Sequence, residues 1–572
     1  MARSQESVFN MQPLKRSYSG CVLRALWIIA CWALLKISAQ DINTRLFQSD
    51  PEQLKRLTRS RSLLKSATTD HHPVLRVMIY GQSHSLGEWS NYLAANLQQM
   101  YPHARIVITN RAIAGFSALL LSRSVNSDVV PWQPDLLLLH CMGDNLVDYH
   151  RLYSAIKSQV SCDVLVHADH IQSNSQLNES LDISEISPDT YWVLRNYNWL
   201  PELVNKYDFC WADIRTPWKN YIFDNNIDYK SLLAADGYHC NDLGHRLTAN
   251  LIKEFFRPEP DFVAMDPFDN SKVKTLVMTG SNTLVGKQGS FRIKGNRVDV
   301  VYDSTPETQT PICEFTVDGK GPEEVPNFYS FDRASPAWWT PWPGILAATH
   351  VSMPVEERWT ISTDSISLNT GQVFFSVEGS ITGKDGNGSN FGQPFVSNSK
   401  RLAIVPEAFM QHLAYVLTLQ PPPDDWKIQV DCVLRATKTF KPHPPTQSGF
   451  ESLETLFLSD AEAEHELKII SKSSALVGIK ALRVYSPSGQ ASIEQQAPAI
   501  PLNLLAVYSE GCLKISWPIS FGKGQLKSVP SMGSIASWVR VETDIVERGG
   551  VFECILPVDL LPQTQEYYKW FP

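Results

Sequence analysis

The residues best suited to chemistry stand in two segments about 150 positions apart. Ser83 ends the motif Gly81-Gln82-Ser83, and Asp236 and His239 lie three positions apart in a later loop. A serine hydroxyl becomes a nucleophile when a neighbouring base takes its proton and a third group fixes the tautomer of that base. His239 is the candidate base, and Asp236 is the candidate group that holds its far ring nitrogen. This arrangement predicts nucleophilic attack by Ser83 on a carbonyl carbon.

Such an attack places negative charge on the carbonyl oxygen, which needs hydrogen-bond donors aimed at it. The candidate donors are the backbone N–H groups of Ser83 and Gly115 and the side-chain amide of Asn145. Gln82 and Arg111 are the candidate substrate-binding residues. Two interpretations stay open for Arg111, which could bind an anionic group of a substrate or a nearby carboxylate of the protein.

The elements that must position these residues follow from the apolar spacing between 73 and 257. Five apolar runs predict buried parallel strands, the last of them weaker, and four stretches between them have helical spacing. The strands are expected at 74–80, 105–109, 135–140, 162–167 and 208–214, and the helices at 86–99, 146–159, 190–206 and 243–256. This alternation predicts an α/β fold whose parallel sheet is covered by helices on both faces. Ser83, the segment 110–115 and Gly143 follow strand ends, where such sheets place their ligand sites.

Four short motifs in this region resemble sequence blocks of the SGNH/GDSL hydrolase family. Gly81-Gln82-Ser83 resembles the first block, which carries the nucleophile, and Asn110 to Gly115 resembles the second, whose final glycine donates its N–H. Gly143-Asp144-Asn145 is similar to the third block, whose asparagine donates to the oxyanion. Asp236-Gly237-Tyr238-His239, with Asn241, Gly244 and His245, is close to the fifth. The resemblance implies a flavodoxin-like, three-layer SGNH-hydrolase domain that needs no cofactor.

The sequence departs from the family pattern at two places. Gln82 stands where the first block usually has aspartate, but that position is not the catalytic acid, and Gly-Gln-Ser occurs in acetylesterases of the family. The third block is compressed, since it ends in Asn145-Leu146 rather than in Asn-Asp, which makes the third oxyanion donor less secure. The Gly-x-Ser-x-Gly elbow of α/β-hydrolases is missing, because Ser85 occupies the position of its second glycine.

The chain of 572 residues is too long for one core, so we expect several domains. Residues 1–40 have a basic head, eleven apolar residues over 25–35 and a small-residue cleavage site, which is the pattern of a signal peptide; an uncleaved anchor is the alternative. The polar, basic segment 41–72 is expected to be a solvated linker or an outer helix. The mature protein is therefore expected to be secreted, periplasmic or on the cell surface, with no membrane contact beyond that anchor.

After Pro258 the pattern changes to short β-type runs, which predict a β-sandwich region over 258–496 and a small β module over 497–572. The turns between strands are expected at Asp318-Gly319 and at 385–388. A stretch dense in proline and tryptophan, 336–343, could stack on sugars or pack as an ordered loop against the sandwich. In the first region, the stretches 375–383, 395–399 and 465–485 resemble the β-region that follows SGNH domains in large exported bacterial proteins. In the second, the stretch from 515–518 through 567–569 resembles a small sandwich module found at the ends of exported bacterial proteins.

Composition narrows the range of partners. Hydrophobic content of 43%, with 19% charged residues, is typical of globular proteins, and a net charge of −8 without a large basic domain argues against a nucleic-acid partner. Eight cysteines follow the signal segment without a C-x-x-C pair, so no zinc site is expected and the disulfide pairing stays open. We expect no metal at 167–170, because strand alternation places His167 and Asp169 on one face and His170 on the other. His84 and His245 are expected to be neighbours or packing groups.

The leading hypothesis is an exported serine esterase that removes acyl groups, most plausibly acetyl, from carbohydrate or another small ester. A glycan O-acyltransferase would use the same Ser83, His239 and Asp236. A non-catalytic glycan-binding or adhesion protein on a decayed hydrolase scaffold is the third hypothesis, favoured by the compressed third block and the large β-rich half. The oligomeric state stays open.

Overall fold

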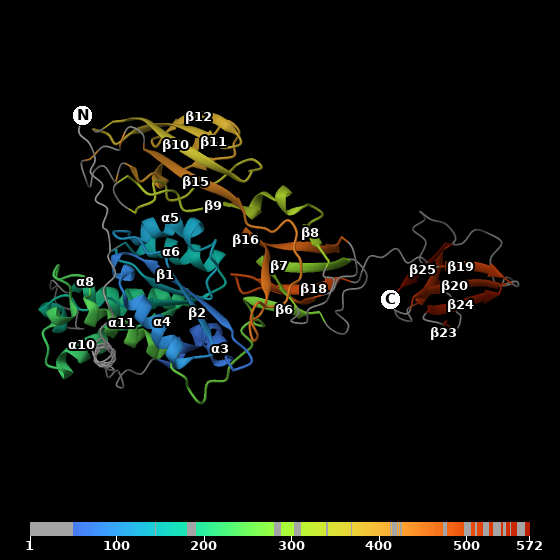
Figure 1. The fold of residues 1–572 in the computed structure, drawn as a ribbon, viewed down its shortest axis with the longest axis horizontal. Coiled ribbons are helices and arrows are strands. Elements are labelled where there is room, and N and C mark those ends of the chain that lie inside the picture. The colour runs from blue at the N-terminus through green and yellow to red at the C-terminus, as the bar shows by residue number, and fades with distance from the viewer. Residues whose placement is uncertain are drawn as a thin grey trace, which may run out of the picture. The chain divides into compact units, whose positions relative to one another are not determined.

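The structure is a computed structural model, and Figure 1 shows its ribbon. It describes residues 50–143, 145–179, 190–278, 288–302, 311–338, 341–367, 369–411, 413, 420, 423, 426–472 and 478–496 and, farther along the chain, the strands of a small C-terminal unit. The expected signal segment 1–40 lies outside the described residues. Among the described helices, none combines the length and the apolar character needed to cross a membrane.

A five-stranded parallel sheet, ordered β2-β1-β3-β4-β5, forms the centre of the first region. Its strands are β1 (Val74–Gly81), β2 (Arg105–Asn110), β3 (Leu136–His140), β4 (Asp163–His167) and β5 (Cys210–Ala212). Every residue of β3 and β4 is buried, as expected when helices cover both faces of a sheet. The predicted α/β fold is confirmed, and the strand order is that of flavodoxin-like sheets.

Figure 1 shows α5 and α6 on one side of this sheet and α4 and α11 on the other. The longer helices are α4 (Trp89–Met100), α5 (Ala118–Asp128), α6 (Leu146–Gln159), α10 (Arg215–Asp224) and α11 (Asp242–Lys253). The expected helix over 190–206 consists of α8 (Thr190–Val193), a π-helical turn η3 (Leu194–Trp199) and α9 (Leu200–Lys206). The shorter helical elements are η2 (Ser83–Leu86), α7 (Asn174–Leu177), η4 (Tyr229–Leu232) and η5 (Glu254–Phe256).

In the described part of the expected linker 41–72, residues 51–65 are helical and pack against the sheet. They form α2 (Pro51–Leu54), η1 (Lys55–Leu57) and α3 (Thr58–Lys65). Leu57 and Leu64 are buried, and the guanidinium of Arg59 donates to Asp135 at 2.7 Å and to the carbonyl of Ser161 at 2.6 Å. Residues 51–65 thus form an outer helical segment, because their leucines are buried and Arg59 bonds groups that lie just before β3 and β4.

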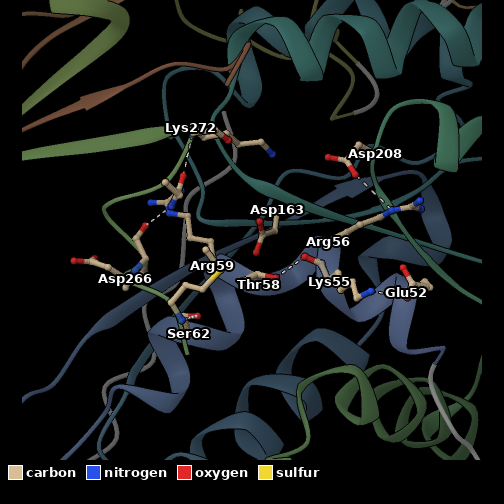
Figure 2. Close-up of a pocket in the computed structure, with 14 residues that line it drawn as sticks. Glu52, Lys55, Arg56, Thr58, Arg59, Ser62, Asp163, Asp208, Asp266 and Lys272 are labelled. Carbon is tan, nitrogen blue, oxygen red and sulfur yellow. Dashed lines mark hydrogen bonds and ion pairs between the residues drawn. The ribbon is translucent and has the colours of Figure 1, made fainter. Parts of the chain in front are cut away.

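A cavity of about 410 Å³ lies between this N-terminal helical segment, the start of β4 and the segment 265–272 (Figure 2). Its charged side chains are largely satisfied by protein groups: Asp163 accepts from the Ser60 N–H at 2.8 Å, and Lys272 donates to the Cys162 carbonyl at 3.0 Å. Asp163 is the first residue of β4, so this cavity lies at the amino end of that strand, whereas Ser83 follows the carboxyl end of β1. We therefore treat the cavity as part of the packing of the N-terminal segment.

Two antiparallel sheets follow in the β-rich region. One has the order β12-β11-β10-β15-β9, and the other has the order β6-β17-β7-β16-β8, with β18 also paired to β7. The strands are β6 (Val273–Val277), β7 (Gln288–Tyr302), β8 (Cys313–Val317), β9 (Tyr329–Phe331), β10 (Glu357–Ile366), β11 (Val373–Gly379), β12 (Gly383–Ser389), β15 (Lys427–Leu434), β16 (Leu453–Ser471), β17 (Ile479–Tyr485) and β18 (Ser492–Gln496). A separate pair joins β13 (Phe395–Val396) to β14 (Ala403–Ile404). Additional antiparallel β domains therefore follow the α/β region, as the sequence predicts.

The two expected turns differ in outcome. Asp318 and Gly319 have φ of 53° and 78° and close a tight turn bridged by Val317 and Lys320, as a two-residue hairpin requires. The run 385–388 instead lies inside strand β12. A Cβ on Gly388 would come within 2.4 Å of Phe395, so this glycine permits close packing of an aromatic ring rather than a chain reversal.

The segment Gln496–Pro572 forms a separate compact unit. It contains a sheet of β19 (Leu505–Ser509), β20 (Cys512–Pro518), β24 (Val551–Pro557) and β23 (Ile545–Arg548), and a second sheet of β22 (Val539–Arg540), β21 (Gln525–Val529) and β25 (Tyr567–Phe571). In the part of the chain that the structure describes, the free thiols include Cys141, Cys162, Cys210, Cys240, Cys313 and Cys432.

Candidate active site

Ser83 lies immediately beyond the carboxyl end of β1, at the start of the short helix η2. The turn is tight because Gly81, with φ of 156°, passes against the backbone of β3: a Cβ there would lie 1.9 Å from the carbonyl oxygen of His140. Only glycine allows this approach. The Gly-Gln-Ser motif thus brings the serine to the sheet edge where Gly143 also lies.

The loop that carries Asp236 and His239 connects η4 to α11 and is fixed from within. The backbone N–H of Ala234 donates to the His239 carbonyl at 2.8 Å, and Gly237 takes a φ of 69° at the tip. Asn241 caps α11 by accepting from the Gly244 N–H at 3.1 Å, while its amide nitrogen donates to two carbonyls of the preceding turn. The motif therefore encodes both the chemical groups and the turn that presents them.

The structure brings Ser83, His239 and Asp236 together. His239 Nε2 lies 2.9 Å from Ser83 Oγ, and its Nδ1 lies 2.7 Å from Asp236 Oδ2. The hydrogen bond from the His239 ring lowers the pKa of Asp236 well below its usual range, helped by the backbone N–H groups of Tyr238 and His239. An ionised Asp236 holds the proton of His239 on Nδ1, which leaves Nε2 as the acceptor that a serine nucleophile needs.

This triad is open to solvent, because the side chain of His239 is 39% exposed and that of Asp236 is 49% exposed. The apolar side chains of Leu86 and Leu146, from the segments that follow Ser83 and Asn145, are also exposed. A large substrate could therefore reach Ser83 without entering a deep channel.

The three expected oxyanion donors have different surroundings. Gly115 is exposed, with φ of 78°, at the end of the segment that follows β2. The Ser83 N–H instead donates to the side-chain oxygen of its neighbour Gln82 at 3.1 Å. Asn145 is the N-cap of α6, since its side-chain oxygen accepts from the Val147 N–H at 3.0 Å. Two of the three expected donors, the Ser83 backbone and the Asn145 side chain, thus take part in local hydrogen bonds.

The two expected substrate-binding residues have protein groups near them. Gln82 is 5% exposed, and its side-chain oxygen also accepts from the Ser83 hydroxyl at 2.9 Å, so it faces the nucleophile rather than solvent. Arg111 lies near Asp128: burial raises the pKa of Asp128, whereas Arg333 and Arg111 act to lower it. The ion-pair partner of Asp128 is Arg333, and both interpretations of Arg111 stay open.

A buried histidine cluster lies behind the triad. The ring of His84 is 4.9 Å from that of His239 and 4.8 Å from that of His170, between centroids. His167 stacks on His140 at 4.5 Å. Burial lowers the pKa of His84 to about 2, of His167 to about 3 and of His170 to about 4, so these rings are neutral near pH 7.

The sequence reasoning did not identify Arg195, which supports this cluster from the π-helical turn. It is 1% exposed and donates to Asp169 at 2.7 Å and to the Gly143 carbonyl at 3.0 Å. Asp169 in turn bonds His140 at 2.9 Å. A signal was present, because Arg195 interrupts a run of aromatic residues in the predicted helix, where a charge needs a buried partner.

No protein-family model and no curated protein matches the chain. Solved structures that match include CEX, a two-domain esterase active on acetylated mannans and co-crystallised with mannopentaose (10% identity, 77% of this chain and 100% of that one, TM-score 0.27). Others are a GDSL-like lipase from Parabacteroides merdae (14% identity, 32% and 97%, TM-score 0.27) and Axe2, an acetylxylan esterase from Geobacillus stearothermophilus (17% identity, 34% and 98%, TM-score 0.26).

At these identities and TM-scores the matches describe similarity only, and the chemistry of this chain has to come from its own Ser83, His239 and Asp236. The sequence motifs of the chain resemble those of the SGNH/GDSL hydrolase family, and the solved structures that it matches include esterases and a GDSL-like lipase.

Proposed function

We propose that the chain is an exported serine esterase that removes acyl groups, most readily acetyl, from carbohydrate. The observation that carries the proposal is the pair of contacts of His239, 2.9 Å to Ser83 Oγ and 2.7 Å to Asp236 Oδ2. A serine hydroxyl bonded to an imidazole whose other nitrogen faces a carboxylate is the arrangement that activates a serine nucleophile.

The reaction proceeds in two halves. His239 Nε2 takes the proton of Ser83 as Oγ attacks the ester carbonyl, and the tetrahedral intermediate expels the sugar hydroxyl, which receives that proton from His239. His239 then takes a proton from water, which attacks the acyl-enzyme, and the carboxylic acid leaves as Ser83 regains its hydrogen. Asp236 stabilises the imidazolium in both halves, and the Gly115 N–H binds the developing oxyanion.

The acyl group and the carbohydrate follow from the resemblance of Gly81-Gln82-Ser83 to acetylesterases of the family. The exposed triad supports a substrate as bulky as a polysaccharide. Suitable test substrates are acetylated mannan and acetylated xylan, because the solved structures reported above include esterases with these activities.

The test is release of acetate from both polysaccharides and of nitrophenol from p-nitrophenyl acetate. Ser83→Ala should lose more than about 10⁴-fold in kcat. Ser158→Ala, which removes a hydroxyl bonded to the Ala155 carbonyl on α6, should match the wild type. Equal turnover by wild type and Ser83→Ala, or failure of a fluorophosphonate probe to label Ser83, contradicts the proposal.

A further inference from the structure

One side chain of the β-rich region reaches the segment that carries the expected oxyanion glycine. Trp342 Nε1 donates to the carbonyl oxygen of Ala114 at 2.6 Å. Its ring also lies against Gly115, since a Cβ on that glycine would be 2.9 Å from Trp342 Cζ2. Trp342 itself is 7% exposed. It belongs to the proline- and tryptophan-dense stretch, and its burial excludes sugar stacking as the role of this particular ring.

The contact matters because the Ala114 carbonyl and the Gly115 N–H belong to the same peptide unit. The described backbone contains no cis peptide, so the two groups point in opposite directions across a rigid plane. Fixing the carbonyl oxygen on one side therefore fixes the direction of the N–H on the other. A hydrogen bond to the carbonyl also polarises the amide, which makes its N–H a stronger donor.

A second side chain of the β-rich region fixes the other end of the same segment. Arg333 donates to the Arg111 carbonyl at 2.8 Å and pairs with Asp128 at 2.5 Å, where the carboxylate is fully buried. The segment 111–115 is thus bonded at both ends to residues that lie more than 200 positions later in the sequence.

The support for Trp342 is itself rigid. Prolines stand on both sides of it, at 341 and 343, and restrict the backbone dihedrals there. The Ala337 N–H donates to the Trp342 carbonyl at 2.5 Å, and the Gly344 N–H donates to the Ser335 carbonyl at 2.9 Å, which closes the base of the loop. A loop built in this way can hold the indole N–H in one place.

We propose that Trp342, assisted by Arg333, is a positioning residue that aims and polarises the Gly115 N–H toward the oxyanion formed at Ser83. The β-rich region then completes the catalytic site. This inference rests on the proposed esterase function and extends it to residues outside the sequence motifs.

The test compares two pairs of variants in the full-length chain. Trp342→Phe keeps the ring and removes the indole N–H, whereas Trp338→Phe alters a tryptophan of the same stretch that packs on Trp426. Arg333→Met removes the bond to the Arg111 carbonyl together with the ion pair to Asp128. Arg123→Met removes a bond between the same two regions, to the Glu407 carbonyl, that does not touch the 111–115 segment.

An oxyanion donor acts in the transition state, so its misalignment lowers kcat and leaves KM unchanged. We expect Trp342→Phe and Arg333→Met to lower kcat for p-nitrophenyl acetate about three- to tenfold, the range of one neutral hydrogen bond. Trp342→Ala should approach the roughly 100-fold loss of a whole oxyanion donor. Hydrogen exchange of the peptide 110–116 should accelerate in these variants, and both controls should match the wild type in kcat, KM and exchange.

The outcomes separate the two proposals. Wild-type turnover with an unchanged kcat in Trp342→Phe and Trp342→Ala overturns the positioning role and leaves the esterase function intact. A fall in kcat that both control variants share equally also overturns it, because the effect would then reflect general loosening of the fold. An inactive wild-type protein overturns the esterase function and this inference together.

Discussion

Asp236 uses its two carboxylate oxygens for different purposes. Oδ1 accepts the backbone N–H groups of Tyr238 and His239 at 2.9 and 3.0 Å, which fixes the turn, and Oδ2 accepts the ring N–H of His239. The spacing of three residues is therefore a structural requirement as well as a catalytic one, because the same side chain shapes the loop and selects the tautomer.

The first prediction separates these two purposes. Asp236→Asn keeps a side-chain oxygen for the backbone N–H groups but cannot stabilise the imidazolium or enforce the tautomer. We expect kcat to fall about 10⁴-fold with little change in melting temperature, by analogy with the same substitution in a serine protease. Asp242→Asn, at a carboxylate that pairs with Arg246 instead, should retain activity. A fall in kcat of less than tenfold for Asp236→Asn would contradict a catalytic role of the triad.

Gln82 competes with His239 for the proton of Ser83. Its side-chain oxygen accepts from both the N–H and the hydroxyl of Ser83, while its own amide nitrogen is buried and has no hydrogen-bond partner among the described residues. A serine hydroxyl donates one hydrogen bond at a time, so the bond to Gln82 must break before His239 can act as base.

The second prediction is that acylation of Ser83 becomes slower as the acceptor at position 82 becomes stronger. Gln82→Leu removes the acceptor and the unsatisfied amide together and should raise the rate of fluorophosphonate labelling about two- to tenfold, the range of one hydrogen bond. Gln82→Glu strengthens the acceptor and should lower that rate by a similar factor. Slower labelling of Gln82→Leu than of the wild type would show that Gln82 assists the nucleophile.

At the scale of elements, the sequence predicted the strands of the parallel sheet better than the helices that cover it. The strands at 74–80, 105–109, 135–140 and 162–167 were found within one residue at each end, because a parallel sheet buried on both faces needs continuous apolar runs. Helices α5 and α10 were missed, since their apolar residues are interspersed with serine, asparagine and aromatic residues that obscure the helical period.

The site was predictable where its residues are local and was missed where they are distant. Ser83, Asp236 and His239 lie in motifs whose turns are self-contained. Trp342 and Arg195 act through contacts with residues far away in the sequence, and no spacing rule within one chain identifies such pairs. The polar contacts of Gln82 also depend on side-chain direction, which a sequence pattern does not specify.

The third prediction concerns Asn241, which joins the end of η4 to the start of α11 at the catalytic loop. Its oxygen caps α11, and its amide nitrogen donates to the carbonyls of Ser231 and Leu233 at 2.8 and 3.0 Å. Asn241→Ala loses all three bonds and should reduce the free energy of unfolding by about 1–3 kcal/mol. Asn241→Asp keeps the cap alone and should lie between Asn241→Ala and the wild type in denaturant unfolding. Equal stability of all three proteins would contradict this role.

At the scale of the whole molecule, the α/β region carries a set of buried titratable groups that links its stability to pH. His84, His167 and His170 are neutral when folded because burial lowers their pKa values to about 2, 3 and 4. In the unfolded chain a histidine titrates near pH 6.5. Asp128 and Asp163 oppose this effect, since burial raises the pKa of both carboxyls.

The fourth prediction follows from the sign of these shifts. Between pH 6.5 and about 4 the unfolded chain binds protons that the folded histidines do not, so each histidine stabilises the fold above pH 6.5 and loses that contribution as the pH falls. The slope is at most about 1.4 kcal/mol per pH unit for each histidine.

His167→Phe keeps an aromatic ring against His140 and removes one of these histidines. Between pH 6 and 4 it should therefore reduce the slope of unfolding free energy against pH by about 1.4 kcal/mol per pH unit. Denaturant titrations at pH 7.5, 6, 5 and 4 measure both proteins. Parallel curves for His167→Phe and the wild type would contradict the burial of His167 in the cluster behind Ser83. They would mean that this histidine is charged or hydrated in the folded protein.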